Sequence, residues 1–235
     1  MLHVDKLRWE KELAASLLLL FALIKPSISV PFIWVALFAC GAFRAVFGCA
    51  IAYALLSLAA TAFRPEPVSA VVQSWLGVVS DIDLGYANIH HWSRLLGVGD
   101  YSMLFSFILL VALGGWVFAR RQCDIWVLLG VAAIISRIWT YHQLYDDLVI
   151  FIAVVALCRI SRKPFARRKG LHIVAWALIL SSWVGLMGPG TLLRMSIPLG
   201  TLYRLGQTLV WAAILLFLLY WAEKEPVAKT APASA

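Results

Sequence analysis

The sequence predicts an all-α fold, a polytopic integral-membrane helical bundle with about six to eight transmembrane or half-depth helices. Hydrophobic residues fill 63% of the 235 positions and charged residues only 14%, whereas soluble domains have about 45–50% and about 25%. The apolar residues form long runs between short polar segments. The net charge is +8, and its Lys and Arg residues cluster beside those runs, as cytoplasmic membrane anchors do.

The same composition argues against several functional classes. The chain carries no nucleic-acid motif and no long basic face, so we expect no nucleic-acid partner. Its four cysteines fall in or beside apolar runs without CxxC spacing and are typical of small core residues. His90 and His91 are adjacent and point in different directions, which makes them a poor metal pair. We therefore expect no metal and no cofactor.

The first two apolar runs are each too short to span a bilayer. LAASLLLLFALI and VPFIWVALFACGAF flank Lys25 and Pro26, and a spanning helix needs about 20 residues. Since Pro26 disfavours helix at Lys25, the two runs form either a re-entrant hairpin or one kinked helix. Lys25 then snorkels to an interface or meets an anion, and both alternatives stay open.

Later apolar runs predict the remaining helices. They lie at about residues 44–62, 101–119, 124–139, 147–157, 171–186 and 202–221. The run VSAVVQSWLGVV, within the polar segment 63–100, predicts a short amphipathic helix at the membrane interface. We expect one membrane domain over residues 1–222 and a disordered tail over residues 223–235.

The basic clusters predict the orientation. RISRKPFARRK contains no acidic residue and is the strongest cytoplasmic signal. With a re-entrant hairpin at Lys25, both termini are cytoplasmic, and segments 63–100, 137–147 and 188–201 share the extracytoplasmic face. With a kinked helix, the N-terminus lies outside. We expect the bacterial cytoplasmic membrane.

The segment RIWTYHQLYDDL concentrates ionisable side chains between two apolar runs. It contains Arg137, Tyr141, His142, Asp146 and Asp147, which are costly in hydrocarbon without a partner or a function. At helical spacing, His142 and Asp146 share one face. The alternative is a polar loop at the membrane surface, with both aspartates in the first turn of an ordinary helix.

Cations beside His and Asp at a bilayer suit a lipid ligand with an anionic phosphate head. Arg and Lys bind phosphate, and His or Asp transfers protons. A proton-coupled transporter with His142 and Asp146 as a relay is a second interpretation. It is disfavoured because the chain lacks paired, Gly/Pro-interrupted segments in two related halves.

The order of three motifs resembles the C-terminal half of the family 87 glycosyltransferases, which are integral-membrane enzymes of the GT-C class. The motifs are LLLLFALIKPSISVPFIWVALF, YANIHHWSRLLGVG and RIWTYHQLYDDLVIFIAVVAL. The resemblance implies transfer of a sugar from a polyprenyl-phosphate donor, such as polyprenol-phosphate mannose, at the extracytoplasmic face. The implied site residues are His142, Asp146 and Asp147 for catalysis and Lys25, Asn88, Arg137 and Tyr141 for substrate binding.

Within this resemblance, Lys25 and Arg137 hold the donor phosphate, because a phosphate leaving group needs positive charge. His142, with Asp146 or Asp147, orients the sugar or its phosphate, and Asn88 lines the pocket.

The chain departs from the family in one respect. Family members carry their catalytic Asp in an N-terminal half that has no counterpart here, and Asp81 and Asp83 stand in the wrong loop to replace it. We therefore expect an enzyme only if a separate N-terminal half or partner membrane subunit completes it. The alternative is a non-catalytic membrane scaffold or accessory subunit that binds membrane lipids.

Overall fold

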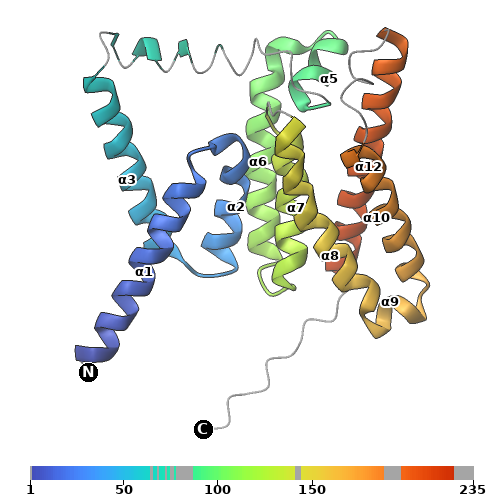
Figure 1. The fold of residues 1–235 in the computed structure, drawn as a ribbon, viewed down its shortest axis with the longest axis horizontal. Coiled ribbons are helices and arrows are strands. Elements are labelled where there is room, and N and C mark those ends of the chain that lie inside the picture. The colour runs from blue at the N-terminus through green and yellow to red at the C-terminus, as the bar shows by residue number, and fades with distance from the viewer. Residues whose placement is uncertain are drawn as a thin grey trace.

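The computed structural model confirms the all-α prediction, since every regular element in the described part of the chain is helical (Figure 1). It describes residues 2–63, 87–140, 144–187 and 197–224, with scattered positions between 66 and 77. The helices are α1 (Leu2–Ala22), α2 (Pro26–Phe38), α3 (Phe43–Ala62), α5 (Ile89–Leu95), α6 (Ser102–Ala119), α7 (Ile125–Ile138), α8 (Ile150–Arg162), α9 (Pro164–Arg168), α10 (Leu171–Met187) and α12 (Ile197–Lys224), with 3-10 turns η1 (Gly99–Tyr101) and η2 (Leu144–Val149).

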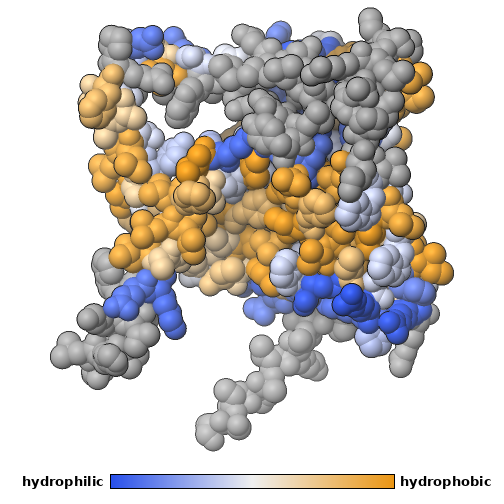
Figure 2. All heavy atoms as spheres, viewed as in Figure 1, coloured by the Kyte–Doolittle hydropathy of each residue, from blue (hydrophilic) through white to orange (hydrophobic). Residues whose placement is uncertain are grey.

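Three of the described helices are long and apolar enough to cross a membrane: Phe43–Ala62, Gly99–Ala119 and Leu199–Lys224. Large apolar side chains cover their outer surfaces, as at Phe47 and Leu216. An apolar band crosses the middle of the face shown in Figure 2. A folded protein with such a belt is a membrane protein, because water would not tolerate so large a continuous apolar patch.

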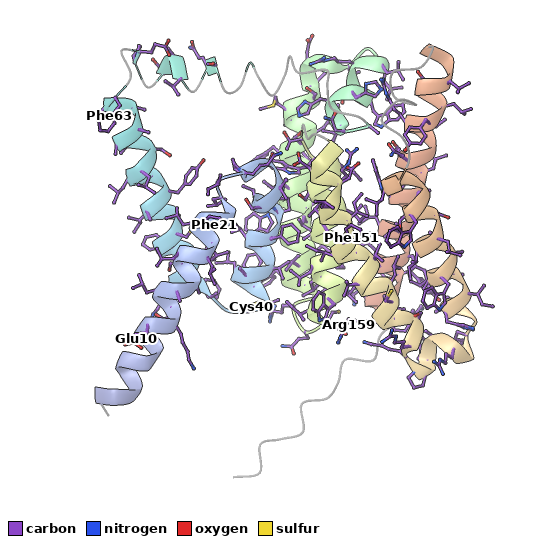
Figure 3. All side chains as sticks on the ribbon, in the orientation of Figure 1. Glu10, Phe21, Cys40, Phe63, Phe151 and Arg159 are labelled. Atoms are coloured by element: carbon purple, nitrogen blue, oxygen red, sulfur yellow. The ribbon has the colours of Figure 1, made fainter. Side chains whose placement is uncertain are left out.

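The helices run alternately up and down between two ends of the bundle (Figure 1). In the view of Figure 1, α3, α7 and α10 rise, and α6, α8 and α12 descend. Phe63 marks the upper end and Arg159 the lower end (Figure 3). Short α5 and η1 cap the upper end, and α9 lies at the lower end.

The first two apolar runs form a helical hairpin rather than one kinked helix. α1 rises, the chain reverses around Lys25, and α2 returns to the lower end (Figure 1). Pro26 occupies the start of α2, where its missing N–H costs no hydrogen bond. α1 packs on α3, whereas α2 packs on α6 and α7. The hairpin therefore carries Lys25 into the upper part of the bundle.

Helix α7 is the core of the bundle. It packs against α2, α6, α8 and α12, and nearly all of its side chains are buried. Gly130 permits this enclosure, since a Cβ there would lie 3.0 Å from Ala156 Cβ and 3.1 Å from Leu218 Cδ1. A larger residue would push α8 and α12 away from α7.

A proline in α2 creates a hydrogen bond between helices. Pro31 has no N–H, so it cannot donate to the carbonyl of Ser27 one helical turn earlier. The indole Nε1 of Trp139 donates to that carbonyl instead, at 2.6 Å. Ser136 Oγ donates to the neighbouring carbonyl of Ile28 at 2.7 Å. Within hydrocarbon these bonds matter, because no water is present to replace them.

Basic side chains gather at the lower end around Asp124, the N-cap of α7. The carboxylate of Asp124 accepts hydrogen bonds from the backbone N–H of Trp126 at 3.0 Å and from Lys163 Nζ at 3.1 Å. Arg159 Nη2 lies 3.6 Å from the same carboxylate. These contacts join α7 to the connection between α8 and α9. The hydrophilic band along the lower edge of Figure 2 includes this region.

Four predicted helix boundaries are wrong. The helix predicted to end at 157 continues to Arg162, and the helix predicted to begin at 202 begins at Ile197. The helix predicted from residue 147 begins as the 3-10 turn η2 and becomes α-helical only at Ile150. The last helix, predicted to end at 221 before a disordered tail from 223, continues to Lys224. Half of VSAVVQSWLGVV, segment 188–196 and the chain after 224 lie outside the described residues.

We expect Trp139→Phe to lower the free energy of unfolding by about 1–3 kcal/mol, because the buried Ser27 carbonyl loses its donor. In a Pro31→Ala background the loss should be smaller, since the restored N–H can bond to that carbonyl. The measurement is a double-mutant cycle by equilibrium unfolding in detergent. Trp34→Phe is the control, because Trp34 Nε1 has no hydrogen-bond partner among the described residues. An identical cost of Trp139→Phe in both backgrounds would contradict this account.

We expect the free energy of unfolding to fall at acid pH because of Asp124. Burial alone raises its pKa, but the Trp126 N–H, Lys163 and Arg159 outweigh burial and hold the pKa below its usual value. The stabilisation is therefore present above the unfolded-state pKa of about 3.9 and is lost as pH falls through the lower folded pKa. Asp124→Asn keeps the cap but removes the charge, so this part of the acid loss should disappear. Circular-dichroism melts between pH 7 and pH 3 test this, and an unchanged acid loss in the variant would refute it.

Candidate functional site

Two ion pairs converge where the helical hairpin meets η2. Lys25 Nζ donates to Asp146 Oδ1, and Arg137 Nε donates to Asp147 Oδ1. The two acceptors are consecutive residues, so all four charges lie together, and we call these four residues the charge cluster. Lys25 comes from the hairpin, Arg137 from the last turn of α7, and both aspartates from η2. A 3-10 turn has three residues per turn, which directs consecutive side chains to different partners.

The Arg137–Asp147 pair is deeply buried. The exposed fraction of the side chain is 1% for Arg137 and 9% for Asp147. The Arg137 guanidinium also lies over the ring of Trp211 in α12, with Cζ 4.0 Å from the ring centroid. Arginine suits such a position, because its planar group can stack on an aromatic face while it donates to a carboxylate. This pair ties α7 to both η2 and α12.

The Lys25–Asp146 pair is asymmetric. The Asp146 side chain is 3% exposed, whereas that of Lys25 is 31% exposed. Lys25 is therefore the member of the charge cluster that an incoming ligand can reach. The cluster as a whole is balanced in charge, with two cations and two carboxylates. An anion that binds Lys25 must compete with Asp146 for the ammonium, or arrive with a proton for that carboxylate.

A cavity of about 330 Å³ lies between α10 and α12 next to this region. Its lining residues are Ser181, Ser182, Tyr203, Gly206, Gln207, Val210 and Trp211. Trp211 thus belongs to both the cavity wall and the Arg137 contact. Gln207 Nε2 donates to the Tyr203 hydroxyl at 3.1 Å. The wall combines aromatic rings with hydroxyl and amide groups.

Asn88 caps a helix and does not join the charge cluster. Its side chain is 2% exposed, and its Oδ1 accepts from the backbone N–H of His91 at 2.8 Å. An N-cap asparagine satisfies a donor that the first turn of α5 leaves unpaired. Within the described part of the chain, we find no hydrogen bond or ion pair from Asn88 to Lys25 or Arg137.

His90 contacts Ser106 of α6, which in turn bonds to Trp139 at the end of α7. Ser106 Oγ donates to the carbonyl oxygen of Trp139, so the 3.3 Å contact between Ser106 Oγ and His90 Nε2 requires a proton on that nitrogen. Burial, followed by the charge of Arg94, lowers the pKa of His90. The imidazole is therefore neutral near pH 7 and serves as a structural donor. Among the described residues no group of three or more His, Cys, Asp or Glu side chains forms a metal site.

The structure places only part of the predicted site. It brings together Lys25, Arg137, Asp146 and Asp147, which are 121 and 10 residues apart within their pairs. Tyr141 and His142 lie outside the described residues, as do Asp81 and Asp83. The predicted pair between His142 and Asp146 therefore stays a prediction. Sequence reasoning missed Trp211, whose only signal was an aromatic residue within an apolar run.

Comparison of the chain with models of known protein families, with curated proteins and with solved structures gives no match. The resemblance to family 87 glycosyltransferases consequently stays a prediction from the motifs.

Removal of one member of the buried pair should destabilise the fold strongly. Arg137→Met leaves Asp147 as an uncompensated buried carboxylate and should cost about 3–5 kcal/mol of unfolding free energy. The double variant Arg137→Met/Asp147→Leu should recover much of that loss, because no buried charge remains. Lys25→Met should cost less than Arg137→Met, since the Lys25 site is partly exposed. Equilibrium unfolding in detergent compares these variants with the native chain, and a double variant no more stable than Arg137→Met would contradict the pairing.

Proposed function

We propose that this chain is the membrane domain of a GT-C-type glycosyltransferase that binds a polyprenyl-phosphate sugar at the charge cluster. The single observation that carries the proposal is the placement of partly exposed Lys25 beside buried Arg137 on one side of an apolar bundle. A lipid-linked phosphate needs an apolar environment for its chain and cations for its head. Both are provided here within one region.

In this proposal the donor phosphate binds Lys25 first, because Lys25 is the accessible cation. Arg137 adds a fixed positive charge from beneath. Asp146, displaced from Lys25, turns towards the sugar together with His142 and Tyr141. Asp147 stays paired with Arg137 and holds that guanidinium in place. Asn88 is left out of the proposed pocket because its amide oxygen caps α5.

The cavity between α10 and α12 supports the sugar part of the proposal. Sugars bind where an aromatic face lies beside hydroxyl and amide groups, since a sugar ring has an apolar face and many hydroxyls. Trp211, Tyr203 and Gln207 supply these groups next to Arg137. We propose that this cavity receives the sugar of the donor or of the acceptor.

The proposed orientation follows the basic residues. The lower end holds the Lys and Arg groups around Asp124, so we place it in the cytoplasm. The charge cluster then faces the extracytoplasmic side, where a lipid-phosphate donor is used. We place the protein in a bacterial cytoplasmic membrane with both termini in the cytoplasm.

One observation favours a second function, a non-catalytic accessory subunit that binds the same lipid. Asp146 and Asp147 both accept from cations, so neither is poised as a general base in the structure. If a partner membrane subunit supplies the catalytic carboxylate, this chain contributes phosphate binding alone.

Binding of a short-chain polyprenyl phosphate to the full chain in nanodiscs tests the phosphate site, with the matching polyprenol as the control. We expect the phosphate to bind more tightly, and Lys25→Gln to weaken phosphate binding by about 10- to 100-fold, the value of one charged hydrogen bond. Lys25→Arg should retain most of the affinity. Equal binding of phosphate and alcohol, or no effect of Lys25→Gln, would overturn the proposal.

Sugar transfer from a polyprenyl-phosphate donor, assayed with any partner subunit present, tests catalysis. We expect Asp146→Asn, Asp147→Asn and His142→Ala to reduce turnover. If the chain binds the lipid phosphate but none of the three substitutions changes turnover, the catalytic role is excluded and the accessory-subunit function is favoured.

A further inference from the structure

Helices α1 and α3 enclose a groove along the C-terminal half of α1 and the N-terminal half of α3. The groove has a volume of about 550 Å³. Its lining residues are Glu12, Leu13, Ser16, Leu17, Leu20, Arg44, Gly48 and Ala52. Glu10, near the start of the groove, and Cys40, near the start of α3, both lie at the lower end (Figure 3).

Small residues produce this groove. Gly48 and Ala52 are one helical turn apart on the same face of α3. A Cβ at Gly48 would lie 3.2 Å from Ser16 Oγ, so the helices approach closely at this point. Opposite the small side chains, α1 presents Leu13, 48% exposed, and Leu17, 56% exposed. The result is a narrow apolar channel that faces the lipid.

Among the described residues that line the groove, one is acidic, Glu12, and one is basic, Arg44, and we call their end of the groove its mouth. Arg44 Nη1 lies 3.5 Å from Glu12 Oε1, at the long limit of a hydrogen bond. The Arg44 side chain is 73% exposed and that of Glu12 is 31% exposed. A guanidinium has five N–H donors, and so exposed a group can present several of them to a ligand.

We propose that this groove binds a phospholipid whose head carries both a phosphate and a primary ammonium, as phosphatidylethanolamine does. The phosphate accepts hydrogen bonds from Arg44, and the ammonium donates to the Glu12 carboxylate. One acyl chain lies in the channel against Leu13, Leu17 and Leu20. The two charged side chains that line the groove and the two charges of the head are complementary in sign.

The chemistry of the mouth selects among lipid heads. A phosphatidylglycerol head has no cation for Glu12 and places its negative charge near that carboxylate. A phosphatidylcholine head has a cation but no N–H to donate. This inference does not depend on the proposed function, because the groove and the charge cluster share no residue.

Native mass spectrometry of the full chain in detergent tests the proposal, with ethanolamine, choline and glycerol phospholipids of identical acyl chains supplied in equal amounts. We expect preferential retention of the ethanolamine lipid. Glu12→Gln and Arg44→Gln should each reduce that retention about threefold to tenfold, the range for a partly exposed charged contact. Arg44→Lys should keep most of it.

The chain offers a matched control pair. Arg120 Nη2 lies 3.8 Å from Glu223 Oε1, and both side chains are substantially exposed. Neither residue lines the groove, so Arg120→Gln and Glu223→Gln should leave lipid retention unchanged. Ala52→Leu should fill the channel and lower retention of the ethanolamine lipid without removing a charge.

Circular dichroism of each variant confirms that it is folded before binding is compared. Equal retention of the three lipid heads by the native chain would overturn the proposal. So would an Ala52→Leu variant with undiminished retention, or Glu12 and Arg44 variants that behave like the Arg120 control.

Discussion

The buried ion pair between Arg137 and Asp147 is the constraint on which the upper part of this bundle depends. Arg137 projects from the most enclosed helix of the described structure, with a side chain 1% exposed. A charge in that position is tolerable only with a partner and good geometry. Asp147 and the ring of Trp211 provide these, so η2 and α12 must lie where they do. The end of α7, the start of α8 and the middle of α12 are thereby placed relative to one another.

The second pair extends the same arrangement to the hairpin. Asp146 directly precedes Asp147 in η2, so the contact that fixes Asp147 also fixes the position of Asp146. The 3-10 turn then directs the Asp146 carboxylate towards Lys25. A separate hydrogen bond joins the hairpin to the end of α7. Pro31 leaves the Ser27 carbonyl without its helical donor, and the Trp139 indole N–H donates to it instead. Together these contacts fix a break in a membrane helix that would otherwise leave polar backbone in hydrocarbon. The fold thus stabilises, by polar contacts, the same turn that presents a lysine.

A balanced cluster of four charges has consequences for function. A site built only to bind phosphate would carry an excess of cations, whereas here each cation already has a carboxylate. Such a cluster can exchange partners, because a phosphate can replace Asp146 at Lys25 without leaving Arg137 uncompensated. The same balance makes the cluster a stable structural element without any ligand. This dual character is the reason that lipid binding and catalysis have to be tested separately.

The sequence alone determined the class of fold, the positions of most helices and the group of residues worth attention. Hydrophobic runs are local properties of the chain. Charged residues between such runs are costly in hydrocarbon, so the sequence alone points to Lys25, Arg137, Asp146 and Asp147. Only the tertiary structure decided which cation meets which carboxylate. It replaced a helical first turn at Asp146 and Asp147 by a 3-10 turn, made Asn88 a helix cap, and recruited Trp211 and Trp139. The physical reason is that these contacts join residues far apart in the chain, and their geometry depends on how helices pack around α7, which no local pattern encodes.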